Sequence, residues 1–279
     1  MQIIQKRKIF YIISLIFIIP SLVSLMFQGL NLGIDFTGGS IMHVKIESSI
    51  SAADVRTALS EMELDTAEVQ KSENEFYIRS RELSQEESNK LLSTLKSNFD
   101  NVEFLSAESV GATIGSELTR NAILSLLAAA VLMLVYISFR FEWTFGVAAI
   151  IAILHNVLIV LGVFSLFQWQ INTAFIAAML TVIGYSINDT IVIFDRVREN
   201  LRMNRREERS QLLNRSIMQT LNRSINTVLT SAFTLLALLL FGGTTIKFFV
   251  AAMLIGFVVG AYSSIFIASP VWFEIKNRA

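Results

Sequence analysis

The chain has 279 residues, of which 53% are hydrophobic and only 16% are charged, and its formal net charge at pH 7 is zero. Soluble domains carry about 25% charged residues, so the composition indicates an integral membrane protein. The balanced charge gives no sign of a nucleic-acid partner. The sequence has no cysteine and only two histidines, which excludes disulfides and thiolate metal sites. Neither a metal nor another cofactor is expected.

Six segments are apolar and long enough to cross a bilayer, which requires about 20 residues each. They are residues 9–27, 121–139, 145–167, 173–195, 225–241 and 248–269. Three basic residues precede the first segment, as in a signal peptide. That segment is too long for a signal peptide and lacks a small-residue cleavage site, so we expect a retained membrane anchor.

Basic residues gather on one side of the predicted topology. The N-terminus carries three Lys or Arg, and the connection after the second span carries one. The segment 196–223 carries eight, and the C-terminal tail carries two. The short loops on the opposite side hold only Lys247. By the positive-inside rule, both termini are cytoplasmic and the long connection 29–119 is extracytoplasmic.

The connection 29–119 is acidic, with 16 Asp and Glu against 7 Lys and Arg. Alternation and turn signals predict strands at 41–46, 67–71, 75–80 and 101–107, a helix at 51–59, and a second helix that begins at the capping box Ser84–Glu87. The order β-α-β-β-α-β is that of a ferredoxin-like α+β domain. Nothing in this segment resembles a catalytic site.

These signals divide the chain into three parts. We expect a tail and first span at 1–28, the extracytoplasmic domain at 29–119, and a bundle of five spans at 120–279 that contains an arginine-rich cytoplasmic loop at 196–223. The fold class is therefore a polytopic α-helical membrane protein with six transmembrane helices and one outer α+β domain.

The fourth span contains an ionisable residue, Asp189, inside a segment, 172–194, that carries no other charge. An acid in this position costs about 2.5–3.5 kcal/mol on insertion scales, and such residues usually face a helix bundle or a water-filled path. Because desolvation disfavours the charged form, the carboxyl can bind and release a proton. The structural alternative is an acid locked in an ion pair that joins two helices.

Polar side chains lie near Asp189 along the helix. Asn188 and Thr190 are its neighbours in sequence, and Tyr185 and Ser186 lie about one turn earlier. These four residues are candidates to hydrogen-bond the acid or to hold water beside it.

Arg223 opens the polar start of the fifth span and is the candidate partner of Asp189. A permanent cation there can stabilise the charged acid or promote release of its proton when the helices move. The alternative is an anchor that extends to the lipid headgroups, and the residues alone leave both interpretations open.

Four other features have weaker signals. Asp195 ends the fourth span and is expected to be a solvated interfacial acid. The arginines of 196–209 are either an orientation signal in contact with lipid headgroups or a docking surface. His155 is expected to pack with hydrogen bonds inside the bundle rather than to carry protons. Gly256 and Gly260 form a GxxxG pattern that allows close helix approach.

A glycine-rich segment follows the first span. It contains Gly33, Asp35, Phe36, Gly38 and Gly39. Paired glycines allow positive φ angles and close backbone approach, and Asp suits a turn. A phosphate-binding loop would need a Lys and a following helix, so we expect a turn that leads into the first outer strand.

The glycine segment 33–39, the outer domain and the run 184–200 together resemble the SecF family of bacterial protein-export membrane proteins, which belongs to the resistance-nodulation-division (RND) superfamily. The resemblance covers essentially the whole chain. The glycine motif is shared with SecD, which usually has a much larger outer region. The resemblance implies a multi-pass protein of the bacterial cytoplasmic membrane that is not an enzyme.

The resemblance also implies partners and roles. Members of this family pair with SecD, work with the SecYEG channel and YajC, and use the proton-motive force to promote preprotein translocation through that channel. Preproteins and membrane lipids are therefore the other expected partners. The proton-transporting acid maps onto Asp189 and the arginine of the fifth span onto Arg223, whereas the matching SecD acid lies on another chain.

Three alternatives remain from the residues. A proton-coupled exporter of small molecules or lipids from the same superfamily would be expected to have about twelve spans and two large outer domains in one chain. An intramembrane aspartyl protease needs two facing aspartates, but Asp189 and Asp195 point to different faces of one helix. A purely structural assembly subunit would leave Asp189 without a role.

Overall fold

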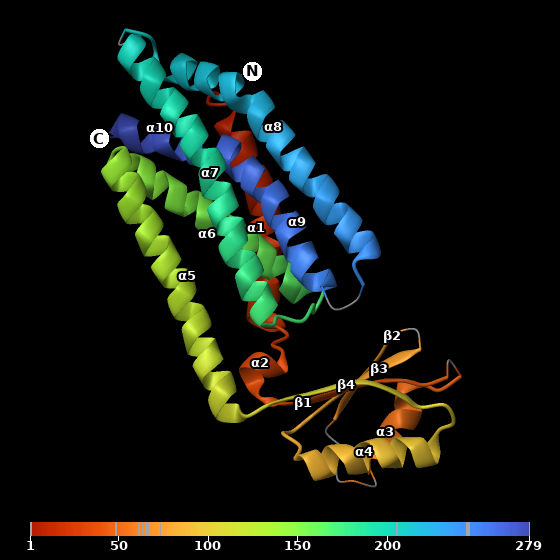
Figure 1. Cartoon of the computed structure of the whole chain (residues 1–279). Coiled ribbons are helices and arrows are strands. Elements are labelled where there is room, and N and C mark those ends of the chain that lie inside the picture. The colour runs from red at the N-terminus through yellow and green to blue at the C-terminus, as the bar shows by residue number, and fades with distance from the viewer. Residues whose placement is uncertain are drawn as a thin grey trace. The chain divides into compact units, whose positions relative to one another are not determined.

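The computed structural model describes residues 2–47, 49–60, 62, 64, 67–72, 74–204, 206–243 and 246–278. The chain forms two compact units. One consists of Met1–Asn31 with Ile123–Ala279 and is called the bundle unit below. The other, Leu32–Ala122, is called the sheet unit. Figure 1 shows the helices and strands of both units.

Long helices make up the bundle unit. They are α1 (Arg7–Phe27), most of α5 (Ala112–Arg140), α6 (Trp143–Leu166), α7 (Thr173–Met203), α8 (Arg209–Phe241) and α9 (Lys247–Ser263), which continues through the π-helical turn η1 (Ser264–Ala268) into α10 (Ser269–Arg278). Among the described residues, six helical stretches are long and apolar enough to cross a membrane. The six predicted spans are therefore confirmed.

The segment 196–223, expected as an arginine-rich loop, is mostly helical. Helix α7 continues to Met203 and α8 begins at Arg209, so that a short connection joins them. Arginine and glutamate are good helix formers, and Arg196 pairs with Glu199 on the same helix at 2.6 Å. Both helices therefore project beyond their apolar regions.

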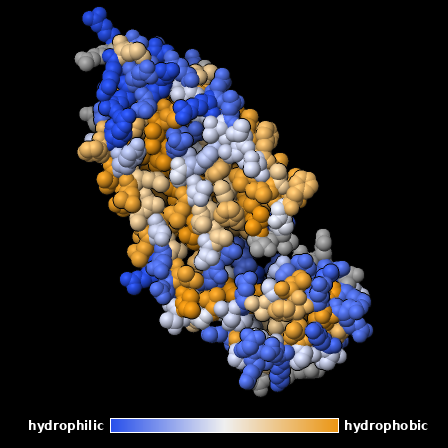
Figure 2. Space-filling model, in the orientation of Figure 1, coloured by the Kyte–Doolittle hydropathy of each residue, from blue (hydrophilic) through white to orange (hydrophobic). Residues whose placement is uncertain are grey.

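Both chain termini lie at the same end of the bundle unit (Figure 1). Hydrophilic residues cover this end, whereas the middle of the helices presents hydrophobic surface (Figure 2). The excess of Lys and Arg in the connections at this end identifies it as the cytoplasmic end.

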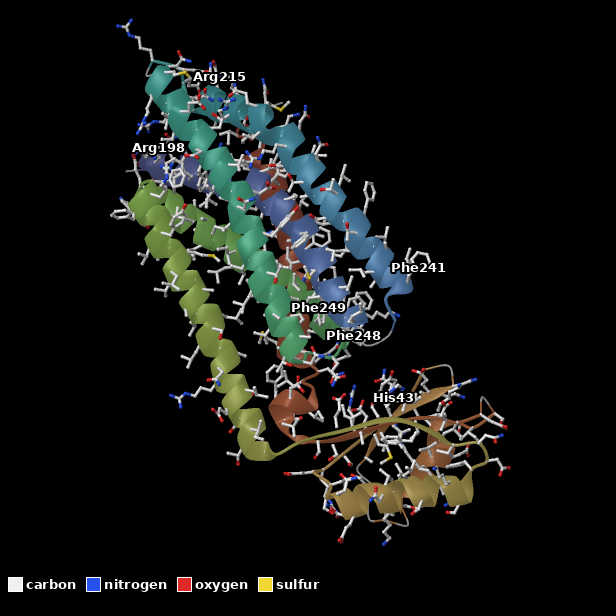
Figure 3. All side chains as sticks on the ribbon, viewed as in Figure 1. His43, Arg198, Arg215, Phe241, Phe248 and Phe249 are labelled. Atoms are coloured by element: carbon white, nitrogen blue, oxygen red, sulfur yellow. The ribbon has the colours of Figure 1, made fainter. Side chains whose placement is uncertain are left out.

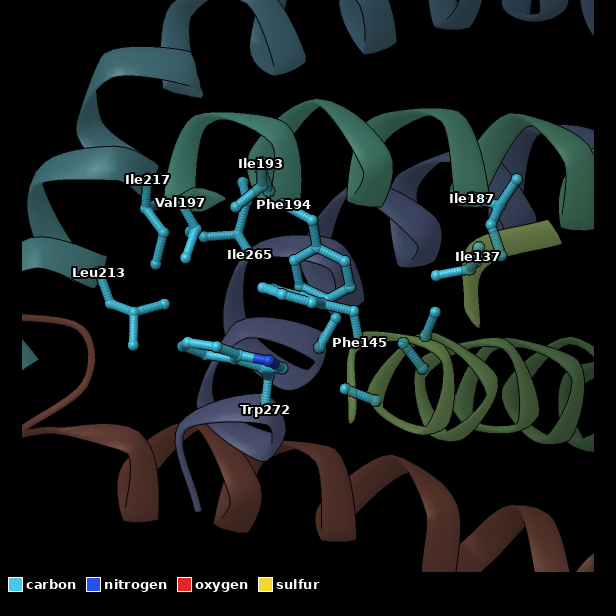
Figure 4. Close-up of a cluster of buried hydrophobic side chains, with 14 of the residues drawn as sticks. Ile137, Phe145, Ile187, Ile193, Phe194, Val197, Leu213, Ile217, Ile265 and Trp272 are labelled. Carbon is cyan, nitrogen blue, oxygen red and sulfur yellow. The ribbon is translucent and has the colours of Figure 1, made fainter. Parts of the chain in front are cut away.

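Helices α6, α7 and α9 form the centre of the bundle. More than half of the apolar stretch of α6 is buried, against 6% in α5 and 11% in α8. At the cytoplasmic end, Phe145 stacks on Trp272 with ring centroids 4.6 Å apart and also packs against Phe194 (Figure 4). The outer helices α5 and α8 instead expose large apolar side chains, as expected for surfaces that meet lipid or a second bundle.

Helix α9 packs closely on α7 at the GxxxG pattern. A Cβ atom at Gly256 would overlap the side chain of Val182, and one at Gly260 would lie 3.1 Å from the Cβ of Ser186. The expectation that these glycines allow close helix approach is confirmed.

The sheet unit contains α2 (Ile34–Thr37), β1 (Gly39–Lys45), α3 (Ala52–Ser60), β2 (Glu68–Ser72), β3 (Glu75–Ser80), α4 (Gln85–Asn98) and β4 (Glu103–Val110). The strands are antiparallel in the order β2-β3-β1-β4. This order, with α3 and α4 on one face of the sheet (Figure 1), is the ferredoxin-like split βαβ arrangement. The predicted fold class is confirmed.

The capping box that starts α4 is present. The N–H of Glu87 donates to the hydroxyl of Ser84, and the N–H of Ser84 donates to the carboxylate of Glu87 at 2.8 Å. Hydrogen bonds from Arg81 and Ser84 hold the pKa of Glu87 at about 2, below its usual 4.5. Because this pKa is lowered on folding, the contribution of Glu87 to stability is present above pH 4.5 and is lost as the pH falls towards 2.

The glycine motif connects α2 to β1 with two residues at positive φ, Gly38 at 72° and Gly39 at 123°. A Cβ atom at Gly39 would lie 2.6 Å from the carbonyl oxygen of Ser80 on β3. One helical turn followed by this Gly-Gly pair therefore leads into the first strand, and both conformation and space require glycine.

Replacing Gly39 by alanine is expected to destabilise the sheet unit by about 1–3 kcal/mol, because the side chain would both strain the backbone and meet a carbonyl that is fixed in the sheet. Limited proteolysis of the membrane-embedded chain over a temperature series measures this loss. Gly111→Ala is the matched control, since its Cβ would meet only the flexible end of Glu82 at 3.4 Å. Equal protease sensitivity of the two variants would contradict the assignment.

Candidate functional site

Asp189 lies inside the bundle on α7, with only 4% of its surface exposed. The hydroxyl of Ser224 on α8 donates to its Oδ1 at 3.2 Å. Its other oxygen, Oδ2, is buried and has no hydrogen-bond partner among the described residues. A buried carboxylate normally has several partners. The surroundings of Asp189 therefore suit a carboxyl that gains and loses a proton.

Arg223 neighbours Ser224 on α8 and is exposed. Within the described residues, no ion pair includes Asp189 or Arg223. Asp189 is therefore not locked to a cation of its own chain. The predicted partner lies one residue from the serine that contacts the acid, and its long side chain is exposed.

The polar neighbours of Asp189 do not bond to it in this structure, and two of them connect α7 to other helices. The hydroxyl of Tyr185 donates to the carbonyl of Thr227 on α8 at 2.8 Å. The hydroxyl of Ser186 accepts from the side-chain amide of Asn156 on α6 at 2.8 Å. They hold α7 in place rather than contacting the acid.

The other two neighbours differ from each other. Thr190 is buried and exchanges a hydrogen bond with Ser264 at 2.8 Å. Ser264 begins the π-helical turn η1, a type of irregularity that is frequent at functional sites. Asn188 is exposed on α7. Among the described residues, the side chain that donates to Asp189 is therefore Ser224, and the expectation that these four residues bond the acid or hold water beside it stays a prediction.

His155 takes part in a separate buried network. Its ring nitrogens bond to Ser14 on α1 at 3.0 Å and to Asn156 at 3.1 Å. Tyr262 on α9 lies within 3.3 Å of the same Ser14 hydroxyl. The network joins α1, α6 and α9, which agrees with the expected packing role of His155.

Replacing Ser224 by alanine is expected to destabilise the bundle by about 1–3 kcal/mol when Asp189 is charged, because the buried carboxylate loses its hydrogen-bond donor. Thermal unfolding in detergent measures the change. Thr230→Ala is the control, since the Thr230 hydroxyl bonds only within its own helix. A loss in Thr230→Ala as large as in Ser224→Ala would show that the bond to Asp189 contributes little.

A cavity of about 740 Å³ opens at the cytoplasmic end of the bundle unit. Both Arg223 and Val192, which follows Asp189 by about one turn on α7, line it. The cavity therefore reaches a residue that lies about one helical turn from the acid on α7. Figure 3 shows Arg198, another lining residue, at this end of the bundle. The lining residues are Arg140, Val192, Asp195, Arg196, Arg198, Glu199, Arg202, Met203, Gln219, Thr220 and Arg223.

Among the described residues, no group of three or more His, Cys, Asp or Glu side chains is arranged to hold a metal ion. His43 lies on β1 in the sheet unit (Figure 3). It pairs with Glu75 at 3.1 Å and stacks on Tyr77. These contacts link two strands and are typical of cross-strand pairs.

Two family models match the chain. The model described as the C-terminal region of the protein export membrane protein SecD/SecF matches residues 90–278. The SecD/SecF GG motif matches residues 23–50, which contain the Gly38–Gly39 pair. Together they cover most of the bundle and the entry into the sheet.

The family models do not separate SecD from SecF, but the named relatives do. Protein translocase subunit SecF of Sebaldella termitidis is 40% identical over 284 residues, covering 99% of this chain and 92% of the relative. The SecF subunit of Thermobaculum terrenum is 42% identical, covering 99% of this chain and 94% of the relative. The chain belongs to the SecF family. It is accordingly a multi-pass protein of the bacterial cytoplasmic membrane.

A solved structure agrees with this assignment. The crystal structure of SecDF from Thermus thermophilus, a translocon-associated membrane protein, matches with a TM-score of 0.92 and 38% identity. The match covers 99% of this SecF-family chain but only 38% of the SecDF chain. The larger part of SecDF therefore has no counterpart in this chain.

Proposed function

We propose that this chain promotes preprotein translocation through the SecYEG channel as the partner of SecD, together with YajC, and that the proton-motive force drives it. The names of its relatives, protein translocase subunit SecF, support the translocation role. The match to 38% of SecDF supports a second, SecD-like chain as the missing part. The exposed apolar faces of α5 and α8 give that partner a surface within the membrane.

The observation that supports proton coupling is the setting of Asp189, a buried acid with one hydroxyl donor and an unpartnered Oδ2. A proton that crosses a potential of 100 mV releases about 2.3 kcal/mol. Binding and release of that proton can bias a helix bundle between two arrangements only if they differ in affinity for it. A carboxyl that is dry in one arrangement and hydrated in the other provides this difference.

The proposed roles follow from position. Asp189 binds the proton, Ser224 orients its carboxyl, and Arg223 approaches the charged acid and favours release of the proton. The cavity that Arg223 and Val192 line connects this step to the cytoplasm. The activity is transport, and no step of it requires covalent chemistry by this chain.

Complementation tests the proposed function. In a bacterium depleted of its own SecD and SecF, this chain expressed with its matching SecD is expected to restore preprotein processing, whereas SecD alone does not. Accumulation of unprocessed preproteins is the readout. Normal export without the chain, accompanied by altered sensitivity to small toxic compounds, would contradict the proposal and favour the exporter alternative.

A further inference from the structure

The cytoplasmic cavity carries an uncompensated positive charge. Five arginines and two acids line it. Arg196 pairs with Glu199 at 2.6 Å, and Arg140 lies 3.8 Å from Asp195. The remaining three arginines form no ion pair within the part of the chain that the structure describes. They are Arg198, Arg202 and Arg223.

Unpaired guanidinium groups around one cavity repel each other. An anion between them removes this repulsion, and the planar arginine fork binds phosphate oxygens through two parallel hydrogen bonds. Arg198 is held at the wall, since it donates to the carbonyl of Arg140 at 3.1 Å and lies over the ring of Phe141. Arg202 is exposed and, among the described residues, forms no ion pair.

The cavity lies at the level of the lipid headgroups. Arg140 is the last residue of α5 and lines the cavity. Two aromatic side chains beside it face outward, Phe139 with 93% and Trp143 with 61% of their surfaces exposed. Exposed Trp residues at the ends of spanning helices, such as Trp143, mark the membrane interface. Val192 and Met203 add apolar surface to the lining, which suits the first carbons below a headgroup.

We propose that this cavity binds the phosphate of an anionic phospholipid of the cytoplasmic leaflet. Basic pockets between spanning helices on the cytoplasmic side are suited to such headgroups. The ligand chemistry is a phosphate diester held by Arg198 and Arg202, with its acyl chains in the membrane. The phosphate site lies in the cavity that Arg223 also lines, but it is formed by Arg198 and Arg202 and its test measures lipid binding, which does not depend on the proposed transport function.

Lipid retention by the purified complex tests the proposal. The chain is co-purified with SecD from bacterial membranes, exchanged into detergent with added phosphatidylglycerol or phosphatidylcholine, and weighed by native mass spectrometry. The wild-type complex is expected to keep one phosphatidylglycerol per copy. Arg202→Gln is expected to lower this occupancy at least tenfold. Arg206→Gln makes the same charge change outside the cavity and is expected to keep the lipid.

Three results would overturn the proposal. Equal occupancy in Arg202→Gln and Arg206→Gln would mean that retention depends on overall charge. Equal retention of phosphatidylcholine would remove the role of the anionic headgroup. Displacement of the lipid by millimolar inorganic phosphate would identify a free anion as the ligand. Because Arg202 is exposed and forms no ion pair with the described residues, its substitution is not expected to affect folding, and an unchanged melting temperature of the variant checks this.

Discussion

Replacing Gly162 by alanine is expected to prevent α1 from packing on α6. A Cβ atom at Gly162 would overlap the side chain of Ser21 and lie 2.6 Å from the Cα of that residue. Because the Cα of Ser21 is a backbone atom, a change of side-chain rotamer cannot relieve this clash. Overpacking of this kind costs about 1–3 kcal/mol or more, and α1 is expected to separate from the bundle.

Disulfide cross-linking measures this separation, because the chain has no cysteine of its own. The hydroxyls of Ser24 on α1 and Ser165 on α6 lie 2.8 Å apart, so a cysteine pair at these positions is expected to cross-link readily. Gly162→Ala is expected to reduce the yield several-fold. Gly184→Ala is the control, since its Cβ would meet nothing within 4 Å. Undiminished cross-linking in Gly162→Ala would refute the predicted contact.

Replacing Arg223 by glutamine is expected to remove most of the proton-driven part of translocation while the fold is retained. Arg223 is exposed and forms no ion pair within the described chain, so its replacement by glutamine breaks no ion pair there. The guanidinium of Arg223 is our candidate for the cation that stabilises the charged form of Asp189 and so favours release of its proton. A coupling of about 1–3 kcal/mol corresponds to a change of about 5–150-fold, and a reduction of at least about fivefold is expected.

Translocation into inverted membrane vesicles, with and without an imposed proton gradient, measures this effect. Arg223→Lys keeps the charge and is expected to retain part of the gradient response. Arg215→Gln removes an arginine from the same helix, one that pairs with Glu207 at 2.6 Å, and is expected to behave like wild type. If Arg223→Gln responds fully to the gradient, then Arg223 is only an anchor at the membrane surface.

Much of the architecture is predictable because it depends on local patterns. Hydropathy locates six spans, and the capping box at Ser84 and alternation along Ile41–Ile46 identify the outer βαββαβ order. The ends of α7 and α8 are not predictable in this way. Hydropathy stops where the bilayer stops, whereas helix propensity and pairs such as Arg196–Glu199 extend the helices further.

The division at 1–28, 29–119 and 120–279 stays a prediction about functional domains, since compactness alone does not assign function. Asp189 is identifiable as a lone charge in an apolar segment. Ser224 is not, because serines are common and only the crossing of α7 and α8 brings this one to the acid. The sequence signal that could have identified Ser224 is its position next to Arg223, in the polar start of the fifth span.

The glycine contacts show the same limit. Gly256 and Gly260 are recognisable because their spacing of four places them on one helix face. Gly162 has no such partner in sequence, although a Cβ there would meet Ser21 as closely as any glycine contact in the bundle. The bond from Ser264, at the start of the π-helical turn, to Thr190 on another helix is likewise a contact that no local pattern reveals.

The gradient response of Asp189→Asn tests most directly whether Asp189 couples protons to translocation. Preprotein import into inverted vesicles is compared for wild type, Asp189→Asn and Asp195→Asn, each co-expressed with SecD. Asparagine keeps the acceptor for Ser224 but cannot exchange a proton. We expect Asp189→Asn to assemble with SecD and to lose the gradient-dependent part of import, and the exposed Asp195→Asn to keep it. A full gradient response in Asp189→Asn would reduce Asp189 to a structural residue and place the energy-coupling step in the partner chain.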